Sequence, residues 1–159
     1  MGAAAKNISH LIIYYSMINL CTSFIPDLRF RHPFSMLISG STGVGKSHFI
    51  KNVIECGGAD VDFDNIFYFM PRLEQIDLVP LKNQELFLLQ GLPDEDWIKE
   101  NIKEDGSNNM IVIDDQWGKC LDNEIIYTLL THDRRHRGVS LCFISQNFFE
   151  KAKNAITLR

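Results

Sequence analysis

The sequence contains no paired-cysteine motif, no internal repeat, no low-complexity tract and no excess of positive charge. Its four cysteines, Cys21, Cys56, Cys120 and Cys142, are scattered, and no two of them have C-x-x-C spacing. The scatter argues against a disulfide scaffold or a zinc ribbon and suits a reducing compartment. The formal net charge is −4, so any contact with DNA must come from a local patch rather than from a global basic field.

The sequence also lacks a clean hydrophobic run of membrane-spanning length. Leu11–Ile25 is largely apolar, but polar residues such as Asn19 and Thr22 interrupt it, and it is short for a spanning helix. Met1-Gly2 opens like a myristoylation site, yet Lys6 stands where Ser or Thr is required. We therefore expect no membrane segment and an intracellular protein that is not secreted. Residues 1–26 are interpreted as an extension of uncertain structure, with a signal peptide or membrane anchor as the alternative.

One strong motif is present, and it fits the phosphate-binding P-loop pattern G-x-x-x-x-G-K-[ST]. The motif consists of Gly40, Ser41, Thr42, Gly43, Val44, Gly45, Lys46 and Ser47. Its glycines allow backbone N–H groups to turn inward around a phosphate without interference from a Cβ atom. Lys46 would place its charge beside the β- and γ-phosphates of ATP, and the Ser47 hydroxyl can ligate Mg²⁺. The sequence therefore predicts ATP and Mg²⁺ as ligands.

The segments around the motif predict an α/β fold with a parallel sheet. A strand is expected at 34–38, and Phe49, Ile50, Val53 and Ile54 lie on one face of a helix that follows the loop. Further strands are expected at 65–70, 110–115 and 139–144, with a short extra strand at 85–89. One helix should open after Pro93, and another should be capped by Asp122. The continuous apolar run before Asp114 is typical of a strand that is buried on both faces.

Polar residues follow two of these strands at the edge where ligands bind in parallel sheets. Asp114 fits a Walker B aspartate, which would hold Mg²⁺ through its water shell. Asp115 is placed to polarise an attacking water. Gln146 ends the neighbouring strand, where its amide could orient water and sense the γ-phosphate. We predict that these three side chains converge on the P-loop.

A basic cluster lies before the last predicted strand and admits several roles. Arg134, Arg135 and Arg137 could supply an arginine finger in trans across an oligomer, or contact DNA phosphates, or form a solvated charge cluster at a helix end. His132 and His136 also imitate a two-histidine metal motif with i,i+4 spacing. That motif lacks its usual glutamate base, and no third ligand is evident.

From Asp27 onward the chain resembles the DNA-packaging ATPases of the FtsK–HerA superfamily, and most closely those of Polinton/Maverick elements and of poxviruses. The segments that carry the resemblance are Arg31-His32-Pro33-Phe34, the P-loop, Phe67-Tyr68, Gly91-Leu92-Pro93, Ile111-Val112-Ile113-Asp114-Asp115, Thr131 to Arg137 and Ser145-Gln146-Asn147-Phe148-Phe149. The resemblance implies a P-loop NTPase of the ASCE/RecA-like type, a three-layer sandwich, with Lys46/Ser47 as Walker A, Asp114/Asp115 as Walker B and Gln146 as sensor. It also implies a finger arginine, for which Arg137 is nearest.

The resemblance further implies the activity and the partners. Members of the family assemble as homo-oligomeric rings and translocate double-stranded DNA into capsids, so capsid proteins are possible partners. The location would be the host nucleus or cytoplasm, with association with the virion possible. The alternatives are a nucleotide-binding remnant without turnover and a small P-loop kinase. The Asp114-Asp115 pair and the following Gln-terminated strand disfavour the kinase.

We expect the chain to differ from the family in one respect. We expect residues 27–159 to form a P-loop ATPase domain that is C-terminally incomplete and lacks the last strand, which packs beside the P-loop strand in the family. Phe34 to Ser39 would then form an edge strand without a guarding charge or proline. Residues 11–18 could fill the vacant place as a strand, or pack over the sheet as a helix.

Overall fold

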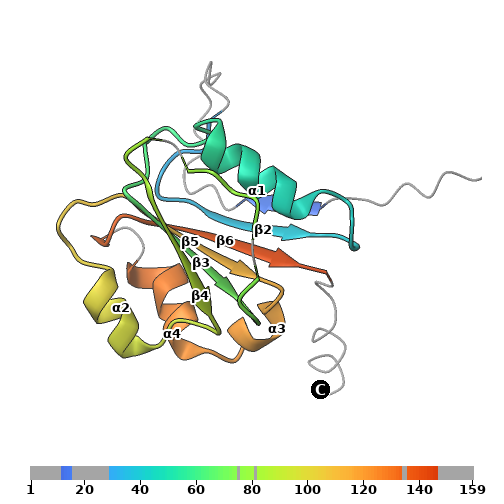
Figure 1. The fold of residues 1–159 in the computed structure, drawn as a ribbon. Coiled ribbons are helices and arrows are strands. Elements are labelled where there is room, and N and C mark those ends of the chain that lie inside the picture. The colour runs from blue at the N-terminus through green and yellow to red at the C-terminus, as the bar shows by residue number, and fades with distance from the viewer. Residues whose placement is uncertain (1–11, 16–28, 75, 81, 134–135, 147–159) are drawn as a thin grey trace, which may run out of the picture.

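The protein has an α/β fold whose central sheet contains five parallel strands and one antiparallel strand at its edge (Figure 1). The computed structural model describes residues 12–15, 29–74, 76–80, 82–133 and 136–146. The parallel strands, in their order across the sheet, are β2 (Ser35–Ser39), β6 (Val139–Ser145), β5 (Asn109–Asp114), β3 (Asn65–Met70) and β4 (Glu85–Gln90). This fold is P-loop-like in its strand order, and each strand expected from the sequence is found.

Side chains of the inner strands alternate between two hydrophobic clusters, one on each face of the sheet. On β5, Met110 and Val112 belong to one cluster, whereas Ile111 and Ile113 belong to the other. All of these residues are fully buried or nearly so. The alternation explains why β5 is apolar without interruption, because a strand covered on both faces has no solvent side. By contrast, every position of β4 is exposed or half-buried, as is usual for an edge strand.

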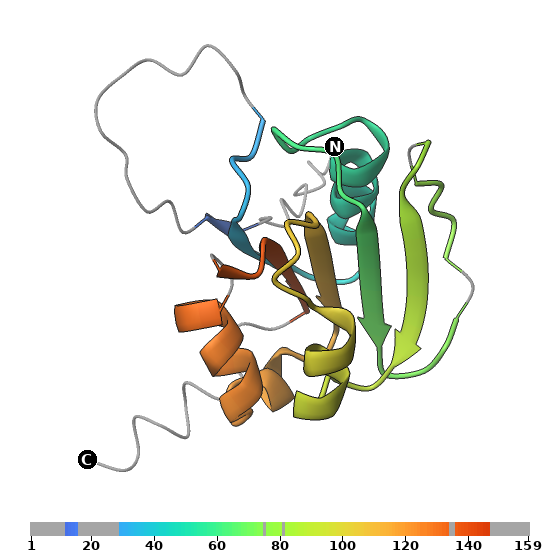
Figure 2. The ribbon, with the colours of Figure 1, turned by 90° about the vertical axis from the view of Figure 1, so that its left-hand side faces the viewer.

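Helices cover both faces, so the protein has three layers (Figures 1 and 2). Helix α1 (Lys46–Glu55) covers one face and buries Ile50, Val53 and Ile54 there. Helices α2 (Glu95–Asn101), α3 (Trp117–Cys120) and α4 (Glu124–Thr128), with the π-helical turn η1 (Leu129–Asp133), cover the other. No helix among the described residues is long and apolar enough to span a membrane.

The caps of α2 and α4 show where local chemistry starts each helix. The Asp94 carboxylate accepts a hydrogen bond from the backbone N–H of Trp97, which satisfies a free donor of the first turn of α2. The predicted cap at Asp122 is wrong by one residue. Asn123 is the cap, and its side-chain oxygen accepts from the N–H groups of Ile125 and Ile126. Asp and Asn are both favourable N-cap residues, so the side-chain types alone do not show at which of the two the helix begins.

A strand from the predicted extension lies beside the P-loop strand. Residues Ile12–Tyr15 form β1 (blue in Figure 1), which pairs antiparallel with β2 in the register Ile12↔Ser39 to Tyr15↔Met36. Of the two possibilities open for residues 11–18, the structure contains the strand. The place beside β2 that the family's last strand would fill is occupied by a strand from the other end of the sequence, which runs in the opposite direction. β2 is not an edge strand, which agrees with its five buried residues.

Removal of residues 1–26 should therefore cause aggregation. Without β1, the N–H and C=O groups along one side of β2 lose their partners, and an uncovered strand of this kind pairs with other chains. We expect light scattering and size-exclusion chromatography to show large assemblies for residues 27–159 and a smaller, discrete species for the full chain. A soluble monomer of residues 27–159 that unfolds cooperatively would contradict this role of β1.

Candidate functional site

The P-loop connects β2 to α1 at the carboxyl end of the sheet. Two of its glycines, Gly43 and Gly45, have φ angles of 81° and 94°, in the left-handed region that side chains with a Cβ rarely adopt. Gly45 is also the residue from which α1 starts, and no side chain caps that helix end. The free N–H groups of the first turn of α1 are therefore directed toward the loop, which is the arrangement that binds anions.

Lys46 is held inside the loop. Its side chain is only 9% exposed, and Nζ donates hydrogen bonds to the backbone oxygens of Gly40 and Ser41 at 2.8 and 3.0 Å. These bonds close the loop on itself and hold the ammonium group at its mouth. Both carbonyls are neutral, so the ammonium group keeps its positive charge at the loop, and an anion bound there would meet a cation already in position.

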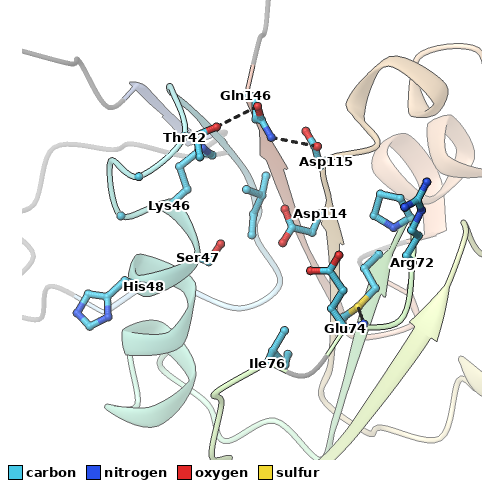
Figure 3. A pocket seen from close by; sticks show the side chains of 15 residues that line it. Thr42, Lys46, Ser47, His48, Arg72, Glu74, Ile76, Asp114, Asp115 and Gln146 are labelled. Atoms are coloured by element: carbon cyan, nitrogen blue, oxygen red, sulfur yellow. Dashed lines mark hydrogen bonds between the residues drawn. The ribbon is translucent and has the colours of Figure 1, made fainter.

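The P-loop forms one wall of a cleft with a volume of about 640 Å³ (Figure 3). The opposite wall is formed by Asp114, the last residue of β5, by Asp115, which follows it, and by Gln146, which follows β6. In the close-up view the Asp114 carboxylate points toward Ser47 across the cleft. The structure therefore brings Asp114, Asp115 and Gln146 to one cleft beside the P-loop, as the sequence predicted.

Asp114 lies at the buried end of the cleft, where its carboxylate accepts a hydrogen bond from the Tyr68 hydroxyl at 2.7 Å. Burial raises the pKa of the Asp114 carboxyl above its usual value, while Tyr68 and Lys46 oppose this shift. Burial and the neighbouring Asp114 raise the pKa of Tyr68. The nearby Ser47 side chain opposes this rise and lowers the pKa of the same phenol, so Ser47, Tyr68 and Asp114 form a compact group.

Asp115 lies at the open end of the cleft and has an unusual backbone. Its φ angle is 51°, which Asp tolerates better than most residues and which turns the chain sharply out of β5. The Gln146 amide donates to Asp115 Oδ2 at 3.2 Å and accepts from the Thr42 hydroxyl at 3.1 Å. A hydrogen-bonded chain thus joins the P-loop to β6 and to β5 (Figure 3).

Several residues in and near the cleft were not predicted from the sequence. Arg72 and Glu74 line it from the loop that follows β3, a segment that carries no motif. Gln116 is 3% exposed and donates from Nε2 to the Gly91 oxygen at 2.6 Å, which fixes the turn after β4 beside the Asp115 segment. The available signal for Gln116 in the sequence was an amide directly after the pair of aspartates.

Arg137 lies at the opposite end of the sheet. It precedes β6, whereas Gln146 follows it, and β6 has seven residues, which corresponds to roughly 20 Å. Its guanidinium Nη1 donates to the Ile102 oxygen at 3.0 Å. Arg137 therefore does not reach the cleft of its own chain. Arg134 and Arg135, and the His132 side chain of the possible metal motif, lie outside the described residues.

Comparison with models of protein families, with curated proteins and with solved structures gave no match to this chain. A fold alone does not define a function, so any function must be inferred from the chemistry of the cleft.

Proposed function

We propose that this protein is a Mg²⁺-dependent ATPase whose active site is the cleft between the P-loop and the two aspartates. The observation that carries the proposal is convergence. One cavity is lined by Lys46 and Ser47 from the start of α1, by the aspartate pair at the end of β5 and by Gln146 after β6, although up to about a hundred residues separate them in the sequence. If the motif matched the P-loop pattern by chance, there would be no reason for these distant residues to line the same cavity.

Each residue of the cleft would have a separate role in ATP binding and hydrolysis. Lys46 and the N–H groups at the start of α1 would bind the β- and γ-phosphates. Ser47 would ligate Mg²⁺ directly, and Asp114 would bind its water shell. Mg²⁺ neutralises developing phosphate charge when it is bound. Asp115 would polarise the attacking water, and Gln146, already in contact with Asp115 and Thr42, would orient that water.

The strand order supports an ASCE/RecA-like assignment. In the family that the sequence resembles, the P-loop strand lies between the sensor strand and a further strand. Here β2 lies between β6, which ends at the proposed sensor Gln146, and β1. The antiparallel direction of β1 is a difference from that pattern, but it leaves the cleft residues in place because β1 lies on the far side of β2.

We further propose that the ATPase translocates double-stranded DNA as a homo-oligomeric ring, as the resembled packaging enzymes do, with a capsid protein as a possible partner. The protein would then act in a host nucleus or cytoplasm. The position of Arg137, remote from its own cleft, is compatible with a finger that reaches the cleft of a neighbouring subunit. Ring formation brings such groups together, so the ATPase rate per chain should increase with protein concentration.

Phosphate release with and without duplex DNA tests this proposal. With Mg-ATP, we expect the full chain to release phosphate and to do so several-fold faster when duplex DNA is added. Samples without Mg²⁺ serve as the blank. If the rate of phosphate release is the same with and without duplex DNA, the protein is an ATPase, but the proposal that it translocates DNA is wrong. Tight ATP binding without any release would favour the nucleotide-binding remnant instead.

A further inference from the structure

Tyr68 is a buried polar residue that belongs to neither the P-loop nor the aspartate pair. Its side chain is only 3% exposed, within the hydrophobic cluster on the α1 face of the sheet. A phenol hydroxyl placed there needs a partner, since an unpaired buried donor is costly. Its partner is Asp114 Oδ2, at 2.7 Å.

The strand register explains how the two residues meet. Tyr68 on β3 is paired with Val112 on β5, two residues before Asp114. Side chains two apart lie on the same face of a strand. The neighbours Phe67 and Phe69 belong to the cluster on the opposite face. The phenol is therefore on the face covered by α1, beside the helix start that carries Ser47.

We propose that Tyr68 is the positioning residue for the Mg²⁺ site, orienting Asp114 so that one carboxylate oxygen is left for the metal's water shell. The inference rests on the proposed function, because it concerns the metal of the same cleft. The phenol occupies Oδ2 and leaves Oδ1 to accept a further hydrogen bond. Groups that orient a metal-binding carboxylate typically change metal affinity by about 10- to 100-fold when they are removed.

The chemistry of a phenol suits this role better than that of a cation. A neutral donor fixes the carboxylate without cancelling the negative charge that attracts Mg²⁺. The Tyr68 hydroxyl is such a donor, since it already donates to Asp114 Oδ2 at 2.7 Å. A lysine or arginine at this place would instead compete with the metal for the carboxylate.

Tyr68→Phe tests the proposal by removing the hydroxyl and keeping the buried ring. We expect the Mg²⁺ concentration for half-maximal phosphate release to increase by about tenfold or more. ATP binding measured without Mg²⁺ should be unchanged. Tyr127→Phe is the matched control, since it removes the same hydroxyl from a side chain that is 66% exposed on α4, and it should leave the Mg²⁺ dependence unchanged.

A double-mutant cycle shows whether Tyr68 acts through Asp114. In an Asp114→Asn background, Tyr68→Phe should cause little or no further change in Mg²⁺ dependence. Equal shifts in both backgrounds, or an unchanged Mg²⁺ dependence in the single variant, would overturn the positioning role. A full chain that neither binds nor hydrolyses Mg-ATP would instead overturn the proposed function, so the two failures are distinguishable.

A measurement on the unsubstituted side chain covers the case in which Tyr68→Phe fails to fold. Tyrosine labelled with ¹³C at Cζ and incorporated at position 68 reports on the phenol directly. We expect Mn²⁺-ATP to broaden this resonance, because the paramagnetic ion would lie next to Asp114. Sharp signals at position 68 in a chain saturated with Mn²⁺-ATP would place the metal elsewhere and overturn the proposal.

Discussion

Lys46→Ala should abolish measurable ATP binding. The Lys46 ammonium lies at the mouth of the P-loop, hydrogen-bonded to the neutral oxygens of Gly40 and Ser41, and would make charge-assisted hydrogen bonds with the β- and γ-phosphates. Each such bond contributes about 1.5–3 kcal/mol, and about 1.4 kcal/mol corresponds to a tenfold change in affinity. Loss of two bonds therefore predicts an affinity at least roughly 100-fold weaker.

Lys51→Ala is the matched control for Lys46→Ala. It removes the same charge from the same helix, but at a surface position where Lys51 pairs with Asp77 at 2.7 Å. Such surface pairs contribute little to stability, and neither Lys51 nor Asp77 lines the cleft. Calorimetric titration with Mg-ATP should separate the two variants, with thermal unfolding confirming that both are folded. Equal ATP affinity in Lys46→Ala and the parent protein would mean that the P-loop does not bind the nucleotide.

Asp115→Asn should separate nucleotide binding from turnover. The substitution keeps the size of the side chain, and the amide oxygen can still accept the hydrogen bond from Gln146 that Asp115 receives. It removes the carboxylate that would polarise water. We expect ATP affinity close to that of the parent and a turnover number lower by roughly 10²-fold or more, the contribution of a general base.

Two comparisons define the role of Asp115. Asp114→Asn should weaken the Mg²⁺-dependent part of ATP binding, because Asp114 faces Ser47 across the cleft. Asp96→Asn removes an exposed carboxylate in the first turn of α2, remote from the cleft, and should leave turnover unchanged. Steady-state phosphate release gives all three rates. A parental rate in Asp115→Asn would assign the base to another group, for which Glu74 on the same cleft is the next carboxylate.

Features with a local signature could be predicted from the sequence. The P-loop carries its own pattern, and its flanking strand and helix follow from the spacing of apolar residues. The continuous apolar run of β5 indicated a strand buried on both faces, and the two hydrophobic clusters confirm it. Asp114, Asp115 and Gln146 could be placed on one edge, because parallel strands all end there.

Features decided by distant pairing could not be predicted with the same certainty. The direction of β1 depends on a free strand edge, which offers hydrogen bonds to a chain running either way. The roles of Glu74 and Arg72 depend on the path of an irregular loop. The contact between Tyr68 and Asp114 could have been predicted. Tyr68 carries a hydroxyl in the buried strand β3, where it lies on the same face as Met70 and needs a polar partner, and the neighbouring strand β5 ends in an aspartate.

The most direct test is a structure of the full chain with Mg²⁺ and a non-hydrolysable ATP analogue. The account predicts the β- and γ-phosphates inside the 40–47 loop beside Lys46, and Mg²⁺ bound by Ser47 and linked through water to Asp114. It also predicts that Asp115 and Gln146 face the γ-phosphate. A nucleotide bound elsewhere on the protein, or an empty P-loop at a saturating concentration of the analogue, would contradict it.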